Sequence, residues 1–173
     1  MTPGVSIKKP GKNSVDAAGN VVALTELTQL VLPQMVARKR GKVLLLASLA
    51  AFQPGPGMAV YYATKSYVLS FGRAIGRELR GTGVTITTLC PGATTSEFAQ
   101  VANMQGSALF EGPVPVMTAA EVARQGYAAL KAGRPQIITG PINKIIAMST
   151  RFTPTAILLM IAGRLNRPGS GQT

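Results

Sequence analysis

The chain has 173 residues, 46% of them hydrophobic, which is enough for one domain with its own core. It contains no histidine and one cysteine, which excludes a zinc site, a Ser-His-Asp triad and a disulfide within the chain. The formal net charge is +12, and the six acidic residues are scattered, which argues against a carboxylate pair for glycoside chemistry and leaves Tyr and Lys for acid–base work.

The first part of the chain is expected to form a tail, a helix and a strand. Residues 1–18 are punctuated by Pro and Gly and indicate a loop or tail. Apolar residues at helical spacing predict a helix from Val21 to Ala37, kinked or tightened late by Pro33 and ended by Gly41. The continuous apolar run from Val43 to Ala47 predicts a strand that is covered on both faces.

A loop, a long helix and a second strand are expected next. Residues 50–58 predict the loop, and residues 59–80 predict the helix, ended by Gly81 and Gly83. Residues 84–89 alternate Thr with apolar residues, which predicts a strand.

The last part of the chain adds further helices and one strand. Residues 93–117, rich in Gly, Pro and small residues, predict a mobile lid or a substrate loop. Thr118 and Glu121 form a capping box before a helix that runs to Lys131 and is stopped by Gly133. The remaining expected elements are a strand at 136–139 and helices at 142–152 and 154–165. This alternation of helices and strands predicts an α/β fold with a parallel sheet.

Tyr61 and Lys65 are the strongest candidates for chemistry. They lie four residues apart on the long predicted helix, so the phenol and the ammonium share one face. Ser48 stands at the end of the preceding predicted strand. A unit positive charge about 5 Å from a phenol lowers its pKa by about two units from about 10 at an effective dielectric of about 20. These side chains therefore predict proton transfer to or from an oxygen.

From about Gly19 to its C-terminus the chain resembles the short-chain dehydrogenase/reductase family. Three segments carry the resemblance: Leu44–Ser48, the Y-x-x-x-K motif Tyr61–Lys65, and Leu89–Gly92. The motif is weak alone, and its spacing from Ser48 makes the combination specific. The resemblance implies that residues 19–173 are the C-terminal catalytic half of a Rossmann-like, doubly wound parallel sheet, preceded by a tail at 1–18 that does not resemble the family.

The resemblance also implies an NAD(P)-dependent oxidoreductase that interconverts a carbonyl and an alcohol. Tyr61 would donate or accept the proton beside the cofactor, and Ser48 would hydrogen-bond the substrate oxygen. Lys65 would also hold the nicotinamide ribose, and Asn20 would anchor a water in the proton relay. Four further residues would border the nicotinamide: Pro91, Gly92, Thr94 and Ser96.

Each candidate also has a plainer interpretation. Tyr61 could be half-buried core with Tyr62 as its exposed neighbour, and Lys65 could be a solvated surface charge. Ser48 could bond the backbone at the strand end, and Asn20 could be a helix N-cap. Pro91-Gly92 could be a plain turn, and Ser96 could be a helix cap.

The glycine-rich phosphate turn of a dinucleotide fold is missing from the sequence. Gly81-Thr-Gly83 and Gly55-Pro-Gly57 lack the third glycine, and neither lies between a first strand and its helix. We therefore expect a truncated chain that alone binds NADP or NAD weakly or not at all. We also expect an open apolar edge on the strand at 43–47.

Two other functions stay open at this stage. The chain could be an inactive remnant that serves as an interaction subunit. In the family, the helices matching residues 20–38 and 59–80 pack against a second subunit, which also implies a homo-oligomer. Alternatively, a basic membrane-surface protein could dock through residues 142–168, which contain no acid. The cations of that segment are Lys144, Arg151, Arg164 and Arg167.

No signal peptide, membrane-spanning run or RNA-binding fingerprint is visible in the sequence. We therefore expect a cytoplasmic protein with a small carbonyl or alcohol substrate and no nucleic-acid partner.

Overall fold

A computed structural model describes residues 18–95 and 115–166, and its central feature is a parallel sheet. Within these residues the sheet has three strands in the order β1-β2-β5, spanning Gly41–Leu46, Val84–Cys90 and Gln136–Ile138. Gly41 pairs with Val84 at one end of β1, and Leu46 pairs with Leu89 at the other. The predicted α/β fold with a parallel sheet is confirmed.

Helices cover both faces of this sheet. On one side lie α2 (Leu24–Ala37), which continues a π-helical turn η1 (Ala18–Ala23), and α3 (Ala59–Glu78). On the other side lies α6 (Ala119–Lys131). A short 3₁₀ turn η2 (Leu49–Phe52) follows β1.

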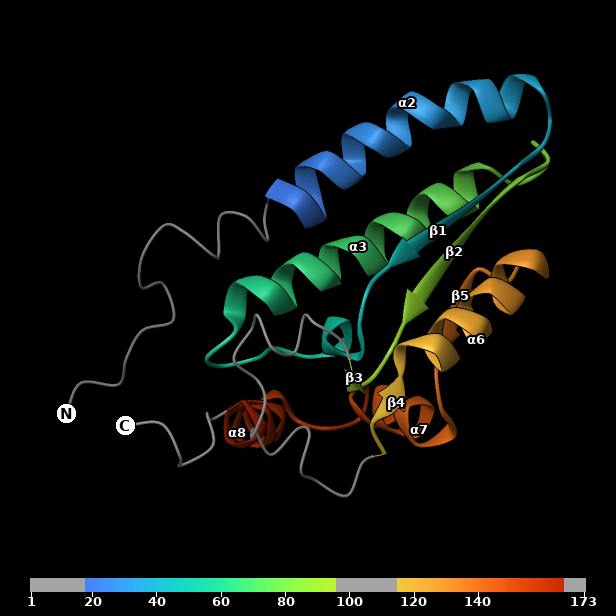
Figure 1. The fold of residues 1–173 in the computed structure, drawn as a ribbon. Coiled ribbons are helices and arrows are strands. Elements are labelled where there is room, and N and C mark those ends of the chain that lie inside the picture. The colour runs from blue at the N-terminus through green and yellow to red at the C-terminus, as the bar shows by residue number, and fades with distance from the viewer. Residues whose placement is uncertain (1–17, 96–114, 167–173) are drawn as a thin grey trace.

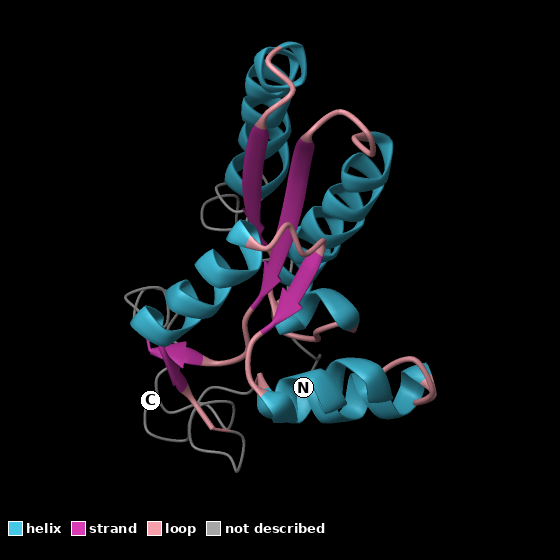
Figure 2. Ribbon diagram, turned by 90° about the vertical axis from the view of Figure 1, so that its right-hand side faces the viewer, coloured by secondary structure: helices cyan, strands magenta, loops and turns pink. Residues whose placement is uncertain are grey.

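Beyond the carboxyl ends of the strands lie the short elements and the last two helices. The two-residue strands β3 (Thr94–Thr95) and β4 (Met117–Thr118) form a parallel pair. Helices α7 (Pro141–Ser149) and α8 (Thr155–Leu165) lie at the bottom of both views (Figure 1, Figure 2).

Local sequence signals explain several helix ends. The hydroxyl of Thr118 accepts a hydrogen bond from the Glu121 amide at 3.2 Å, so Thr118 caps α6, which is one half of the predicted capping box. Gly133 follows that helix with φ +64°, a left-handed conformation that suits glycine. Gly81 and Gly83 have φ values of +82° and +80° after α3, as their predicted role at its end requires.

One expectation around β1 is wrong, and another holds in part. Gly41 does not end the first helix, which stops at Ala37; it begins β1, where a Cβ would lie 2.5 Å from Met35 Sδ. Helices contact β1 from both faces, as predicted, but the cover is incomplete at the end of the strand, where Leu46 is 50% exposed. The strand lies at an edge of the described sheet, as the predicted open apolar edge requires.

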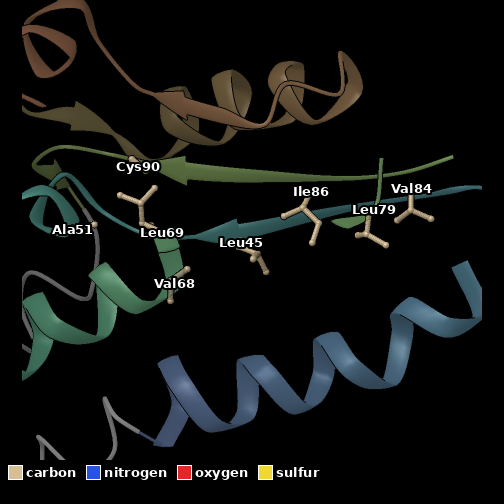
Figure 3. Packing of buried hydrophobic residues seen from close by; sticks show 9 residues of the cluster. Leu45, Ala51, Val68, Leu69, Leu79, Val84, Ile86 and Cys90 are labelled. Carbon is tan, nitrogen blue, oxygen red and sulfur yellow. The ribbon is translucent and has the colours of Figure 1, made fainter. Parts of the chain in front are cut away.

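The apolar core lies between α3 and the sheet (Figure 3). Val68 and Leu69 of α3 pack with Leu45 of β1 and Ile86 of β2, and each is at most 5% exposed. This packing sets the position of α3, and therefore of its side chains near the carboxyl end of β1.

Gly72 allows α3 to approach β2 closely. A Cβ at Gly72 would lie 2.3 Å from Thr88 Oγ1. We expect Gly72→Ala to lower the free energy of unfolding by about 1–3 kcal/mol, because the buried strand cannot retreat. Urea denaturation measures this. The control is Gly76→Ala, whose Cβ would lie an ordinary 3.8 Å from Ile86 and which should be neutral or slightly stabilising.

A second variant separates this steric effect from a general loss of packing. Thr88→Ala removes the overlapping hydroxyl, so Gly72→Ala should cost less in its presence. Additive costs in the double variant would contradict the contact.

Cys90 is a fully buried thiol at the end of β2. Burial raises its pKa from 9.0 to about 12, and the nearby charge of Arg73 offsets only part of this effect. Because the thiolate is the reactive form, we expect iodoacetamide to alkylate the native protein on the order of 10³-fold more slowly than the denatured chain below pH 9. The raised pKa also keeps the native thiol protonated as the pH rises past 9.0. Mass spectrometry of the adduct over time checks this, and equal rates in the two states would contradict it.

Candidate active site

Lys65 is a buried lysine on α3 at the centre of the candidate site. It is 8% exposed, and Nζ donates hydrogen bonds to Leu46 O at 3.0 Å and to Asn20 Oδ1 at 3.3 Å. The same nitrogen lies 5.8 Å from the centre of the Tyr61 ring. A buried ammonium needs such oxygen partners. The interpretation of Lys65 as a solvated surface charge is therefore wrong.

Asn20 connects the start of the first helix to this lysine. Besides accepting from Lys65, its amide donates to Thr64 Oγ1 at 3.4 Å, and the Thr64 hydroxyl donates to Tyr61 O at 2.8 Å. Asn20 lies inside the π-helical turn, so its interpretation as an N-cap is wrong. Single π-helical turns are frequent at functional sites.

The two tyrosines have different surroundings. Tyr61 is half-buried, as one interpretation expected, but Tyr62 is only 7% exposed and is not an exposed neighbour. The Tyr62 hydroxyl donates to Asn166 Oδ1 at 3.1 Å. Burial raises the pKa of Tyr62, while hydrogen bonds with Asn166 and Gln53 counter part of the rise. Tyr62 is therefore a packed core residue, and Tyr61 is the tyrosine beside Lys65.

Ser48 begins the turn after β1. Its Oγ accepts a hydrogen bond from the Ala50 amide at 3.1 Å, which is the plainer role that the sequence also allowed. An accepting hydroxyl keeps its own hydrogen to donate. Ser48 lies two residues after Leu46, whose carbonyl accepts the hydrogen bond from Lys65.

The turn after β2 lies against the Ser48 turn. The Leu49 amide donates to Pro91 O at 2.7 Å, and the Thr94 hydroxyl donates to Gly92 O at 3.0 Å. The structure therefore brings the turn that begins with Ser48 against the turn that contains Pro91, Gly92 and Thr94. Ser96 lies outside the described residues.

Asn143 of α7 is a buried polar residue that the sequence interpretation missed. It is 3% exposed, and its amide donates to Thr139 O at 2.8 Å, while Oδ1 is buried with no hydrogen-bond partner among the described residues. A Cβ at Gly92 would lie 2.4 Å from Asn143 Nδ2. A side chain at position 92 would overlap Asn143 of α7, so the close contact between this turn and α7 requires glycine there. The only sequence signal was an Asn in the first turn of a predicted helix.

Thr64 and the Leu46 carbonyl were also missed. Thr64 stands immediately before Lys65 and could have been suspected from that position. The carbonyl of Leu46 carries no side-chain signal.

An open cavity of about 570 Å³ lies between the turn after β1, α3 and α8. Its lining includes Phe52, Tyr62 and Leu159 but neither Tyr61 nor Lys65. The cavity is therefore beside the candidate site and does not contain its polar groups.

The sequence matches a family model described as short chain dehydrogenase over residues 15–106, more than half of the chain. The chain belongs to the short-chain dehydrogenase family. An uncharacterized oxidoreductase of Myxococcus xanthus is 39% identical over 92 residues, covering 53% of this chain and 36% of that protein. The ketoacyl reductase HetN of Nostoc sp. is 29% identical over 144 residues, covering 80% of this chain and 49% of that protein.

Solved structures of short-chain dehydrogenases share this fold. One from Sphingobium yanoikuyae in complex with NADPH has a TM-score of 0.69 at 22% identity, covering 86% of this chain and 58% of that one. One from Burkholderia cenocepacia in complex with NADP has a TM-score of 0.68 at 18% identity, covering 88% and 61%. The chain spans half or less of the curated relatives named here, 36% and 49% of their lengths.

Proposed function

We propose that this short-chain dehydrogenase chain supplies the proton-transfer residues of an NAD(P)-dependent oxidoreductase that interconverts a carbonyl and an alcohol. One observation carries the proposal: the buried Lys65 ammonium is held 5.8 Å from the Tyr61 ring by Leu46 O and Asn20 Oδ1. Family membership supports the reaction class. Similar structures described in complex with NADPH, NADP and NADH support the cofactor class, with the choice between NADP and NAD open.

The residues fit the nicotinamide end of such a cofactor. Doubly wound folds bind ligands at the carboxyl ends of their strands, which is where Ser48 and Pro91 lie. The ammonium of Lys65 is a donor suited to ribose oxygens, and the hydroxyl of Thr94, which donates its hydrogen to Gly92 O, can accept a hydrogen bond from the carboxamide NH₂ group. The described residues include no glycine-rich turn for the pyrophosphate, so the fit covers one end of the cofactor.

The chain's own residues would move the proton. When bound, the cofactor supplies or accepts the hydride. In the reduction direction, Tyr61 donates its phenolic proton to the substrate oxygen, and Ser48 donates a hydrogen bond that orients the same oxygen. Lys65 stabilises the phenolate that results. Asn20 holds the lysine through Oδ1 and is itself held by Thr64. In this proposal Asn20 would also anchor the water that returns a proton.

Turnover measurements test the proposal. NADPH and NADH oxidation would be followed with a panel of ketones, using the 173-residue chain and a version extended upstream in frame. We expect weak nicotinamide binding by the chain alone and turnover by the extended version. An extended version that binds cofactor but reduces no carbonyl would refute the proposal.

A second candidate function is an interaction subunit, favoured by the exposed apolar side of α2. Leu27 and Leu30 on this helix are 61% and 70% exposed. Sedimentation velocity with Leu30→Glu tests whether helices 20–38 and 59–80 form a homo-oligomer, which the active-enzyme proposal also accommodates. An inactive protein that nevertheless assembles through α2 would favour this second function.

A further inference from the structure

α7, the turn after it and α8 expose an apolar surface at one end of the molecule. These elements lie beyond the carboxyl ends of the strands, at the bottom of Figure 1 and Figure 2. The exposed fractions of the large apolar side chains are 43% for Ile142, 67% for Ile145, 64% for Met148, 84% for Phe152, 42% for Ile157, 40% for Leu159, 51% for Met160 and 44% for Ile161. We call these eight residues the C-terminal apolar surface.

The exposed residues of α7 follow helical spacing. Ile142, Ile145 and Met148 are three residues apart and share one side of α7. The buried residues Asn143 and Ala147, one turn apart, hold the other side against the protein. The side of α7 that faces solvent is therefore its apolar side, the reverse of an ordinary surface helix.

In α8 only one narrow stripe is buried. Leu158 and Ala162, one turn apart, are the buried residues of this helix. The exposed part includes Ile157 and the run Leu159–Ile161. No helix within 18–95 or 115–166 has both the length and the apolar character to cross a bilayer. An apolar surface of this kind fits a helix that lies in an interface.

The charged residues of α7, the turn after it and α8 all have one sign. Lys144, Arg151 and Arg164 are exposed, and residues 141–166 contain no Asp or Glu. Lys144 lies one helical turn from Met148, and Arg151 is next to Phe152. The cations therefore border the apolar side chains, as an anionic apolar partner would require.

We propose that the C-terminal apolar surface docks the protein on an anionic lipid bilayer, with α7 and α8 in the plane of the interface. The apolar side chains enter the region between headgroups and acyl chains, and the three cations contact anionic headgroups. A bilayer supplies both contacts over two separate helices without a shaped partner, whereas a protein would need acids placed around a wide apolar patch. The docking does not depend on the proposed reductase activity.

Vesicle sedimentation of the full chain tests the docking. We expect binding to vesicles of phosphatidylcholine with phosphatidylglycerol, weaker binding to phosphatidylcholine alone, and loss of binding as salt rises. Phe152→Ser and Ile145→Ser should each weaken binding about tenfold. Arg151→Gln should weaken it about fivefold.

Tyr127→Ser is the matched control. Tyr127 is an exposed aromatic residue of α6, 62% exposed, so its replacement should leave vesicle binding unchanged. Equal binding to both kinds of vesicle, binding to neither, or equal loss in Tyr127→Ser would overturn the proposal. A change of oligomeric state by Ile145→Ser without vesicles would also overturn it and assign this surface to a second copy of the chain.

Discussion

Tyr61→Phe is expected to reduce carbonyl turnover by about 10²–10⁴-fold, the usual contribution of one positioned general acid. The variant keeps the ring beside Lys65 and removes only the hydroxyl. Turnover is measured in whichever version of the protein reduces carbonyls in the assay above. Cofactor binding should change little, because the ammonium and both strand-end turns remain.

Tyr62→Phe is the control, since it makes the same change one residue away. Its hydroxyl bonds Asn166 at 3.1 Å, so the loss should cost about 1 kcal/mol of stability and little activity. If Tyr61→Phe keeps turnover within a few-fold of the parent while Tyr62→Phe abolishes it, the assignment of the proton donor is wrong.

Lys65→Met is expected to lower turnover by about 10²-fold or more, because the phenolate loses the charge that stabilises it. The variant also leaves Leu46 O and Asn20 Oδ1 without their charged donor, which should cost about 1–3 kcal/mol of stability. Alcohol oxidation should recover partly at higher pH, where the phenol ionises without help. A purely structural role for Lys65 would not produce this recovery.

Lys131→Met is the matched control for that variant. Lys131 Nζ also lies 5.8 Å from a tyrosine ring centre, that of Tyr127, but on the exposed side of α6. Its replacement should leave both turnover and the pH profile unchanged. Equal losses in Lys65→Met and Lys131→Met would point to a general effect of charge.

The helices and strands could be predicted where a local pattern defines them. The capping box at Thr118 and the glycine at 133 gave both ends of α6, and the Thr-rich apolar run gave β2. Gly41 was misassigned because its role depends on Met35, which packs over it after the chain has turned. The position of Gly41 at the start of β1 is set by this tertiary contact, which leaves no local signal in the sequence.

The candidate site could be predicted only in part, because some of its contacts join residues that are far apart in the sequence. Tyr61 and Lys65 are neighbours on one helix, so their spacing alone puts them together. The bond from Lys65 to Leu46 O depends on how α3 lies on β1, which spacing does not give. The contact of Asn143 with Gly92 joins segments about fifty residues apart, and it required the fold.

The hydrogen bond from the Leu49 amide to Pro91 O ties the turns after β1 and β2 to each other. Neither turn can move away from the other without breaking this bond. Solvent deuterium should therefore reach the Leu49 amide only when the two turns separate, which makes this one backbone hydrogen a reporter of how often the carboxyl ends of β1 and β2 come apart.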